Sequence, residues 1–135
     1  MTNSQSDMLQ AVLGELVAFA GQPDDPLADA DRWQWSMRHR GVPYRPDHWH
    51  GARLTPAQRM TCSRAVRGMA TAGLVERVTE PRRNRVTHLR PTAAGLARAL
   101  AGNDANQTAV TLALRKTDWG AALADEIERA VKVAA

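Results

Sequence analysis

Apolar residues near the start of the chain recur at steps of three and four, which is the spacing of one face of an α-helix. They are Leu9, Val12, Leu13, Leu16, Val17 and Ala20. With Ser6 as the capping residue, this pattern predicts a helix over 6–20. A break over 21–26 that contains glycine and two prolines separates it from a second predicted helix over 27–40, which ends at Gly41.

The stretch over 54–95 contains the clearest alternation of helix and strand signals. Thr55 followed by Pro56 is a typical helix start, and Gly73 is suited to end a helix in the left-handed conformation. We predict in order a helix over 56–72, a strand over 74–78, a turn over 81–84, a return strand over 85–89 and a helix capped by Thr92. Further helices are expected over 106–116 and 119–133, the last of them started by Thr117 and Asp118.

Aromatic residues concentrate between the second and third predicted helices. The segment 42–51 contains two prolines, and we predict an irregular loop whose rings pack on the core. Arg53 and Leu54 are expected to form a short strand that joins the hairpin. Trp33 and Trp35 lie about 200° apart on a helix, so we expect one in the core and the other against a partner or the following loop. Of these alternatives, a structural role for both tryptophans is favoured.

These elements predict a mainly α fold with a small antiparallel β-hairpin wing. A chain of 135 residues, 44% of them apolar, is long enough to bury a core as a single domain over 1–135. We expect the core of this domain over about 27–101, with flanking helices over 6–20 and 104–133. The flanking helices are predicted to form a homodimer interface; the alternative is that they extend the core of the monomer.

Three segments resemble the winged-helix (winged helix-turn-helix) DNA-binding proteins of the MarR-like family. They are Ser63 to Met69, Ala72 to Arg77 and Leu89 to Gly95, and together with their connections they cover about a third of the chain. The resemblance implies that the helix over 56–72 enters the major groove of DNA and that the wing tip over 81–85 reaches the backbone or the minor groove. The chain departs from the family pattern at Gly68, where a long polar residue is usual, and at Arg90-Pro91, which precedes Thr92.

The charge distribution favours a polyanion as the partner. The chain has 18 basic and 14 acidic residues, but 53–98 holds ten arginines and two acids, whereas 1–31 holds six acids and no Lys or Arg. The predicted DNA-binding residues are Thr55, Gln58, Arg59, Thr61, Ser63, Arg64 and Arg67 on the helix and Arg82, Arg83, Asn84 and Arg85 on the wing. The alternative for these arginines is a helix face and hairpin tip that are merely solvated.

We therefore predict a sequence-specific double-stranded DNA-binding protein that acts as a dimeric transcriptional regulator. Two alternatives stay open: a winged-helix module that binds proteins, and a plasmid or phage factor of replication, partition or excision. The operator sequence and any small-molecule effector are not indicated by the sequence.

Other classes of function have little support in the sequence. We expect no enzyme, because there is no nucleophilic triad, phosphate-binding glycine loop or pair of carboxylates in an apolar setting. No cofactor or metal is predicted, since His48 and His50 are only two ligands and zinc requires three or four. Cys62 is the only cysteine in the chain, and we expect it to be buried. A single cysteine, the lack of a secretory signature and the lack of a long apolar run together predict a cytoplasmic protein without a membrane segment.

Overall fold

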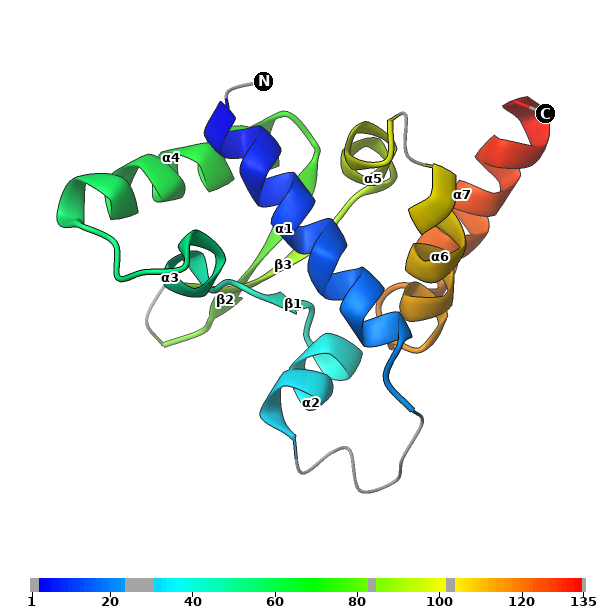
Figure 1. Ribbon diagram of the computed structural model, residues 1–135, viewed down its shortest axis with the longest axis horizontal. Helices are drawn as coiled ribbons and strands as arrows, with labels where there is room; N and C mark the ends of the chain where they lie inside the picture. The colour runs from blue at the N-terminus through cyan, green and yellow to red at the C-terminus, as the bar shows by residue number, and fades with distance from the viewer. Residues whose placement is uncertain (1–2, 24–30, 83–84, 102–103, 135) are drawn as a thin grey trace.

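The computed structural model describes residues 3–23, 31–82, 85–101 and 104–134 of the chain (Figure 1). The elements in order are α1 (Asn3–Ala20), α2 (Arg32–His39), β1 (Val42–Pro43), α3 (Pro46–His50), α4 (Pro56–Thr71), β2 (Val75–Glu80), β3 (Arg85–Pro91), α5 (Ala93–Ala99), the short 3₁₀ helix η2 (Asp104–Asn106), α6 (Gln107–Arg115) and α7 (Ala121–Ala134). The fold is mainly α with one small antiparallel sheet of strand order β1-β3-β2, and its topology is that of a winged helix with additional helices. The predicted fold class is thus confirmed.

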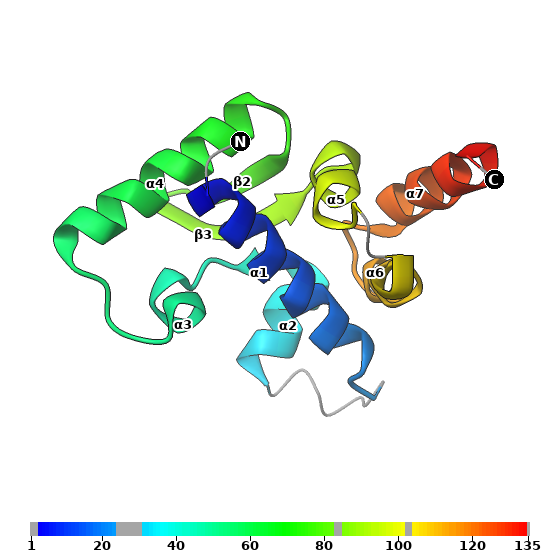
Figure 2. The ribbon, with the colours of Figure 1, turned by 45° about the horizontal axis from the view of Figure 1, so that its top comes forward.

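Helix α1 crosses the middle of the molecule and supplies much of its core (Figures 1 and 2). Its buried apolar side chains are Met8, Leu9, Val12, Leu13, Leu16 and Phe19. They pack against α4, α5 and α6 and against the sheet. The apolar stripe of α1 is therefore used within the chain, as in the alternative interpretation of the flanking helices. The homodimer stays a prediction, but this stripe is not free to form it.

The third strand of the sheet comes from a different segment than the sequence indicated. The expected strand at Arg53-Leu54 is wrong, because β1 is formed by Val42-Pro43, with Val42 opposite Leu89 of β3. The segment 42–51 is accordingly not an irregular loop, since it contains both β1 and α3. Leu54 pairs with no strand that the structure describes. Its side chain is buried, and its backbone N–H donates to Asp47 Oδ1 at 2.7 Å.

Local signals of the predicted kind define both ends of α4. The Thr55 hydroxyl accepts a hydrogen bond from the Gln58 backbone N–H at 3.2 Å, and Gln58 Oε1 accepts one from the Thr55 N–H at 2.8 Å, which completes a capping box. Gly73 follows the helix with φ +76°, a conformation that favours glycine. Gly68, the departure from the family pattern, faces α1, and a Cβ there would lie 2.6 Å from Gln5 Nε2.

Several element ends differ from the sequence-based expectation. Helix α1 begins at Asn3, so Ser6 lies inside it, and α2 begins at Arg32 with Asp31 as its cap. The first four residues of the helix predicted over 27–40 lie outside the described residues. Thr117 does not cap α7: its hydroxyl donates to the Leu114 carbonyl at 2.7 Å, and α7 begins at Ala121. The hairpin strands are longer than expected and extend to Glu80 and Pro91, because ladder pairing continues beyond the apolar residues that marked them.

The helix after the hairpin is anchored directly on the sheet. Thr92 caps α5 as predicted by accepting from the Gly95 N–H at 3.1 Å. A Cβ at position 95 would lie 2.0 Å from the Leu74 carbonyl oxygen, so only glycine fits this close approach. Among the helices that the structure describes, none has the length and hydropathy needed to cross a bilayer.

Candidate functional site

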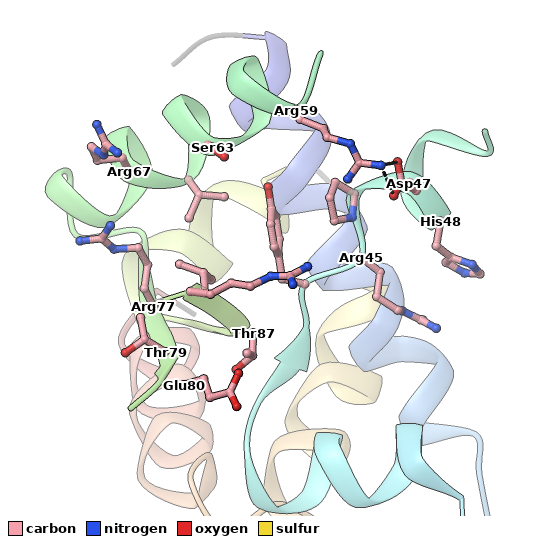
Figure 3. Close-up of a pocket in the computed structure, with 15 residues that line it drawn as sticks. Arg45, Asp47, His48, Arg59, Ser63, Arg67, Arg77, Thr79, Glu80 and Thr87 are labelled. Carbon is pink, nitrogen blue, oxygen red and sulfur yellow. Dashed lines mark hydrogen bonds and ion pairs between the residues drawn. The ribbon is translucent and has the colours of Figure 1, made fainter. Parts of the chain in front are cut away.

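An open cleft of about 960 Å³ lies between α4, the segment around α3 and the β2–β3 hairpin (Figure 3). Its lining residues are Tyr44, Arg45, Pro46, Asp47 and His48, then Arg59, Ser63, Val66 and Arg67 of α4, and Arg77, Thr79, Glu80, Arg85, Val86 and Thr87 of the hairpin. Four of the predicted DNA-binding residues, Arg59, Ser63, Arg67 and Arg85, are thus brought to one cleft. The sequence-based list contains neither Arg77 nor Arg45.

A buried carboxylate on α1 holds one wall of this cleft in place. Glu15 is only 8% exposed and accepts hydrogen bonds from Trp33 Nε1 at 2.6 Å and from Trp49 Nε1 at 3.0 Å, and it forms an ion pair with Arg45. Burial acts to raise the pKa of Glu15, but the hydrogen bonds from Trp49, Arg45 and Trp33 outweigh it and lower the pKa below its usual range. One carboxylate therefore connects α1, α2 and α3.

Asp47, in the first turn of α3, fixes the start of α4. Its Oδ1 accepts the Leu54 N–H, and its two carboxylate oxygens accept from Arg59 Nη2 at 3.1 and 3.0 Å (Figure 3). The backbone hydrogen bond from Leu54, together with the nearby Arg59 charge, lowers the pKa of Asp47. Arg59 is exposed but already neutralised by this pair, so its charge is less available to a ligand than the sequence suggested.

The arginines of the described residues differ in whether they have partners within the chain. Some are engaged: Arg90 Nε donates to the Arg40 carbonyl at 2.7 Å and its guanidinium lies over Trp119, while Arg115 pairs with Asp125 and Glu128. A second group on α4 and the hairpin is exposed and has no carboxylate within ion-pair distance among the described residues. We call it the arginine cluster; its members are Arg64, Arg67, Arg77, Arg82 and Arg85.

The arginine cluster spans α4 and the neighbouring β2–β3 hairpin. Figure 3 shows Arg67 of α4 and Arg77 of β2 at the same end of the cleft, with both guanidinium groups directed outward. Arg85 lines the cleft from β3, and Arg82 precedes it in the turn. Arg83 and Asn84 lie outside the described residues. Like charges gathered on one surface raise the local positive potential, which attracts an anionic ligand.

The polar residues near the start of α4 lie in a different environment. Thr55 and Gln58 are engaged in the capping box, and the Thr61 hydroxyl donates to the Ala57 carbonyl at 3.1 Å. Gln58 and Thr61 line a second hollow of about 640 Å³, on the side of α4 that faces α1 and α3. These three predicted contact residues are therefore not gathered with Ser63 and the arginine cluster.

The sequence-based site does not include Arg77, because this residue lies in the predicted strand over 74–78 and not on the predicted helix or wing tip. The signal that could have identified it is the two-residue period of a strand, which places Arg77 and Thr79 on one face of β2. Tyr44 and Trp49, two of the rings expected to pack on the core, are partly buried and do pack against it. Burial raises the pKa of Tyr44 to about 12, so its hydroxyl remains protonated at neutral pH, and its ring packs edge-on against Trp49 at 5.9 Å between centroids.

The remaining candidate chemistry is sparse. His48 and His50 are exposed on α3, and no group of three His, Cys, Asp or Glu residues in the described part of the chain is placed to hold a metal ion. Cys62 is partly buried, and this burial raises the pKa of its thiol. Comparison with protein-family models, with curated proteins and with solved structures finds no match to this chain.

Proposed function

We propose that this chain is a sequence-specific double-stranded DNA-binding protein that inserts α4 into the major groove and places the β2–β3 hairpin on the backbone or in the minor groove. The observation that carries the proposal is the arginine cluster: five exposed guanidinium groups on α4 and the hairpin, with no carboxylate partner among the described residues. Such a surface suits the phosphates and guanine edges of duplex DNA.

The dimensions and position of α4 support this proposal. Sixteen residues at about 1.5 Å each give a rod of about 24 Å, and a major groove about 12 Å wide admits one α-helix. Figures 1 and 2 show α4 at one end of the molecule, far from α7. Arg64 and Arg67 project from its exposed side, where bidentate hydrogen bonds to guanine become available.

The hairpin supplies the contacts that do not depend on sequence. Arg77 on β2, Arg85 on β3 and Arg82 in the turn lie along the hairpin, beside which a phosphate backbone that passes α4 would run. Phosphate contacts position a protein on the duplex, whereas contacts to base edges specify its sequence. We therefore assign specificity to α4 and general affinity to the hairpin.

A transcriptional regulator that acts as a homodimer is the most economical form of this proposal, because two copies of α4 would read a two-fold symmetric site. A role in replication, partition or excision would use the same DNA contacts. A protein-binding module without affinity for DNA is the competing proposal, and no catalytic activity is proposed.

Fluorescence anisotropy with a pool of random duplexes tests the proposal. If each subunit of a dimer neutralises three or four phosphates, the slope of log affinity against log salt is about −5 to −7, at about 0.9 per phosphate. Arg67→Ala should weaken selected sites more than random DNA, while Arg82→Ala should weaken both equally. Arg129→Ala on α7 removes the same charge far from α4 and serves as the control. Absence of DNA binding, or equal losses for Arg67→Ala and Arg129→Ala, would refute the proposal.

A further inference from the structure

Met60 on α4 is an apolar residue whose side chain is not packed against the rest of the fold. Its side chain is 57% exposed, more than that of any other large apolar residue in the described part of the chain. Met69 lies nine positions later, about 180° around the helix, and is completely buried in the core. Met60 lines neither of the two hollows beside α4. It thus lies on the face of α4 that points away from the rest of the molecule.

This face also holds two members of the arginine cluster. Arg64 and Arg67 follow Met60 by four and seven positions, so both lie within about 40° of it around the helix. At about 1.5 Å per residue, the three side chains span about 10 Å along the axis, or about three base pairs at 3.4 Å each. One apolar residue and two arginines therefore face outward together over the length of a short base sequence.

We propose that Met60 is a specificity residue that recognises thymine through its C5-methyl group, beside guanines contacted by Arg64 and Arg67. This inference rests on the proposed function and names the base class that α4 reads. The thymine methyl is the only apolar group that the four standard bases present in the major groove, and apolar side chains are its usual partners. An exposed methionine is flexible and polarisable, and it can adapt to a methyl group whose position varies slightly.

Replacement of thymine by deoxyuridine tests this contact, because it removes the methyl group and leaves every hydrogen-bonding group in place. Duplexes selected by the wild-type protein from a random pool are resynthesised with deoxyuridine at one thymine at a time. Burial of one methyl group corresponds to about a fourfold change in affinity. We expect about fourfold weaker binding at one thymine position in each half-site, within about three base pairs of a guanine that Arg64→Ala no longer distinguishes.

Variants of Met60 separate this contact from other effects. Met60→Ala should bind the thymine and deoxyuridine duplexes equally, and Met60→Leu should keep the preference. Leu112→Ala is the matched control, since Leu112 is a similarly exposed apolar residue on α6, away from α4, and should leave the preference unchanged. Because Met60 is exposed, these variants should fold as the wild type does, which circular dichroism verifies.

The outcomes distinguish this inference from the proposed function. Sequence-specific binding that is indifferent to deoxyuridine at every position overturns the thymine contact but leaves the DNA-binding proposal in place. Preference for thymine that persists in Met60→Ala overturns the assignment to this residue. A changed oligomeric state in Met60→Ala, with the deoxyuridine effect retained, would place Met60 in a contact between proteins. No binding to any duplex overturns both proposals.

Discussion

Removal of the Glu15 carboxylate is expected to destabilise the domain and to loosen the wall of the cleft that contains α3. The substitution Glu15→Ala leaves the indole N–H groups of Trp33 and Trp49 without their acceptor and leaves Arg45 without its counter-charge. Each buried donor left unsatisfied costs about 1–3 kcal/mol, and both indoles are only partly buried, so we use the lower half of that range. The Arg45 side chain is 36% exposed, so solvent screens its charge and reduces the cost of losing the Glu15–Arg45 ion pair.

These contributions sum to about 3 kcal/mol for Glu15→Ala, within the range measured for single partners removed from buried polar networks. Glu15→Gln keeps the volume and one acceptor but places an amide donor against other donors, and we expect it to cost about half as much. Urea unfolding followed by circular dichroism measures both values. A loss below about 0.5 kcal/mol for Glu15→Ala would contradict this account, because that is the scale of an ordinary surface substitution.

The pH dependence provides a second, independent test of the same network. The pKa of Glu15 is lower in the folded than in the unfolded state, so its contribution to stability is fully present above the unfolded value of about 4.3 and is lost as the pH falls through the folded value. The stability difference between wild type and Glu15→Gln should therefore be constant near neutral pH and shrink below about pH 4. A difference that does not change with pH would show that the carboxylate charge is not the stabilising feature.

Substitutions of two glycines, of the α4 cap and of Asp47 should each change stability or DNA binding in a defined direction. Gly95→Ala should destabilise the domain by about 2–3 kcal/mol, because its Cβ would meet the Leu74 carbonyl. Gly14 has open space around it, so Gly14→Ala should stabilise the domain by about 0.5–1 kcal/mol. The order of the two unfolding midpoints in urea tests both predictions. Thr55→Ala should remove the capping box and cost about 1 kcal/mol, also in urea, without changing the salt slope of DNA binding. Asp47→Asn should keep an acceptor for the Leu54 N–H and release Arg59 from its ion pair. Under the proposed function, this variant should bind DNA more tightly at low salt. Weaker binding in fluorescence anisotropy would contradict this prediction.

The parts of the fold that local chemistry specifies could be predicted from the sequence. The start of α4 follows from Thr55 and Gln58, and its end from Gly73, all within one turn of the helix ends that they define. The hairpin and the Thr92 cap are likewise local. By contrast, β1 consists of two residues, one of them proline, and it exists because Val42 pairs with Leu89 far along the chain. No pattern within the segment could reveal that pairing.

The candidate site shows the same division. Counting arginines located the charged region, and exposure of Ser63, Arg64 and Arg67 agreed with their positions off the apolar stripe of α4. Which arginines are neutralised could not be predicted, because the Arg59–Asp47 pair depends on how α3 sits against α4. That placement depends in turn on Glu15, a buried acid in a helix whose pattern predicted only an apolar face.

The path of α1 through the centre has a consequence for how the chain is made. This helix leaves the ribosome well before two of its partners: Gln10 Nε2 donates to the Ala99 carbonyl at 2.9 Å, and Lys116 Nζ donates to the Phe19 carbonyl at 3.2 Å. At about 5–20 residues per second, its apolar stripe waits about 5–18 s for them. Co-translational protection by a chaperone should therefore improve the soluble yield, and slow translation should reduce it.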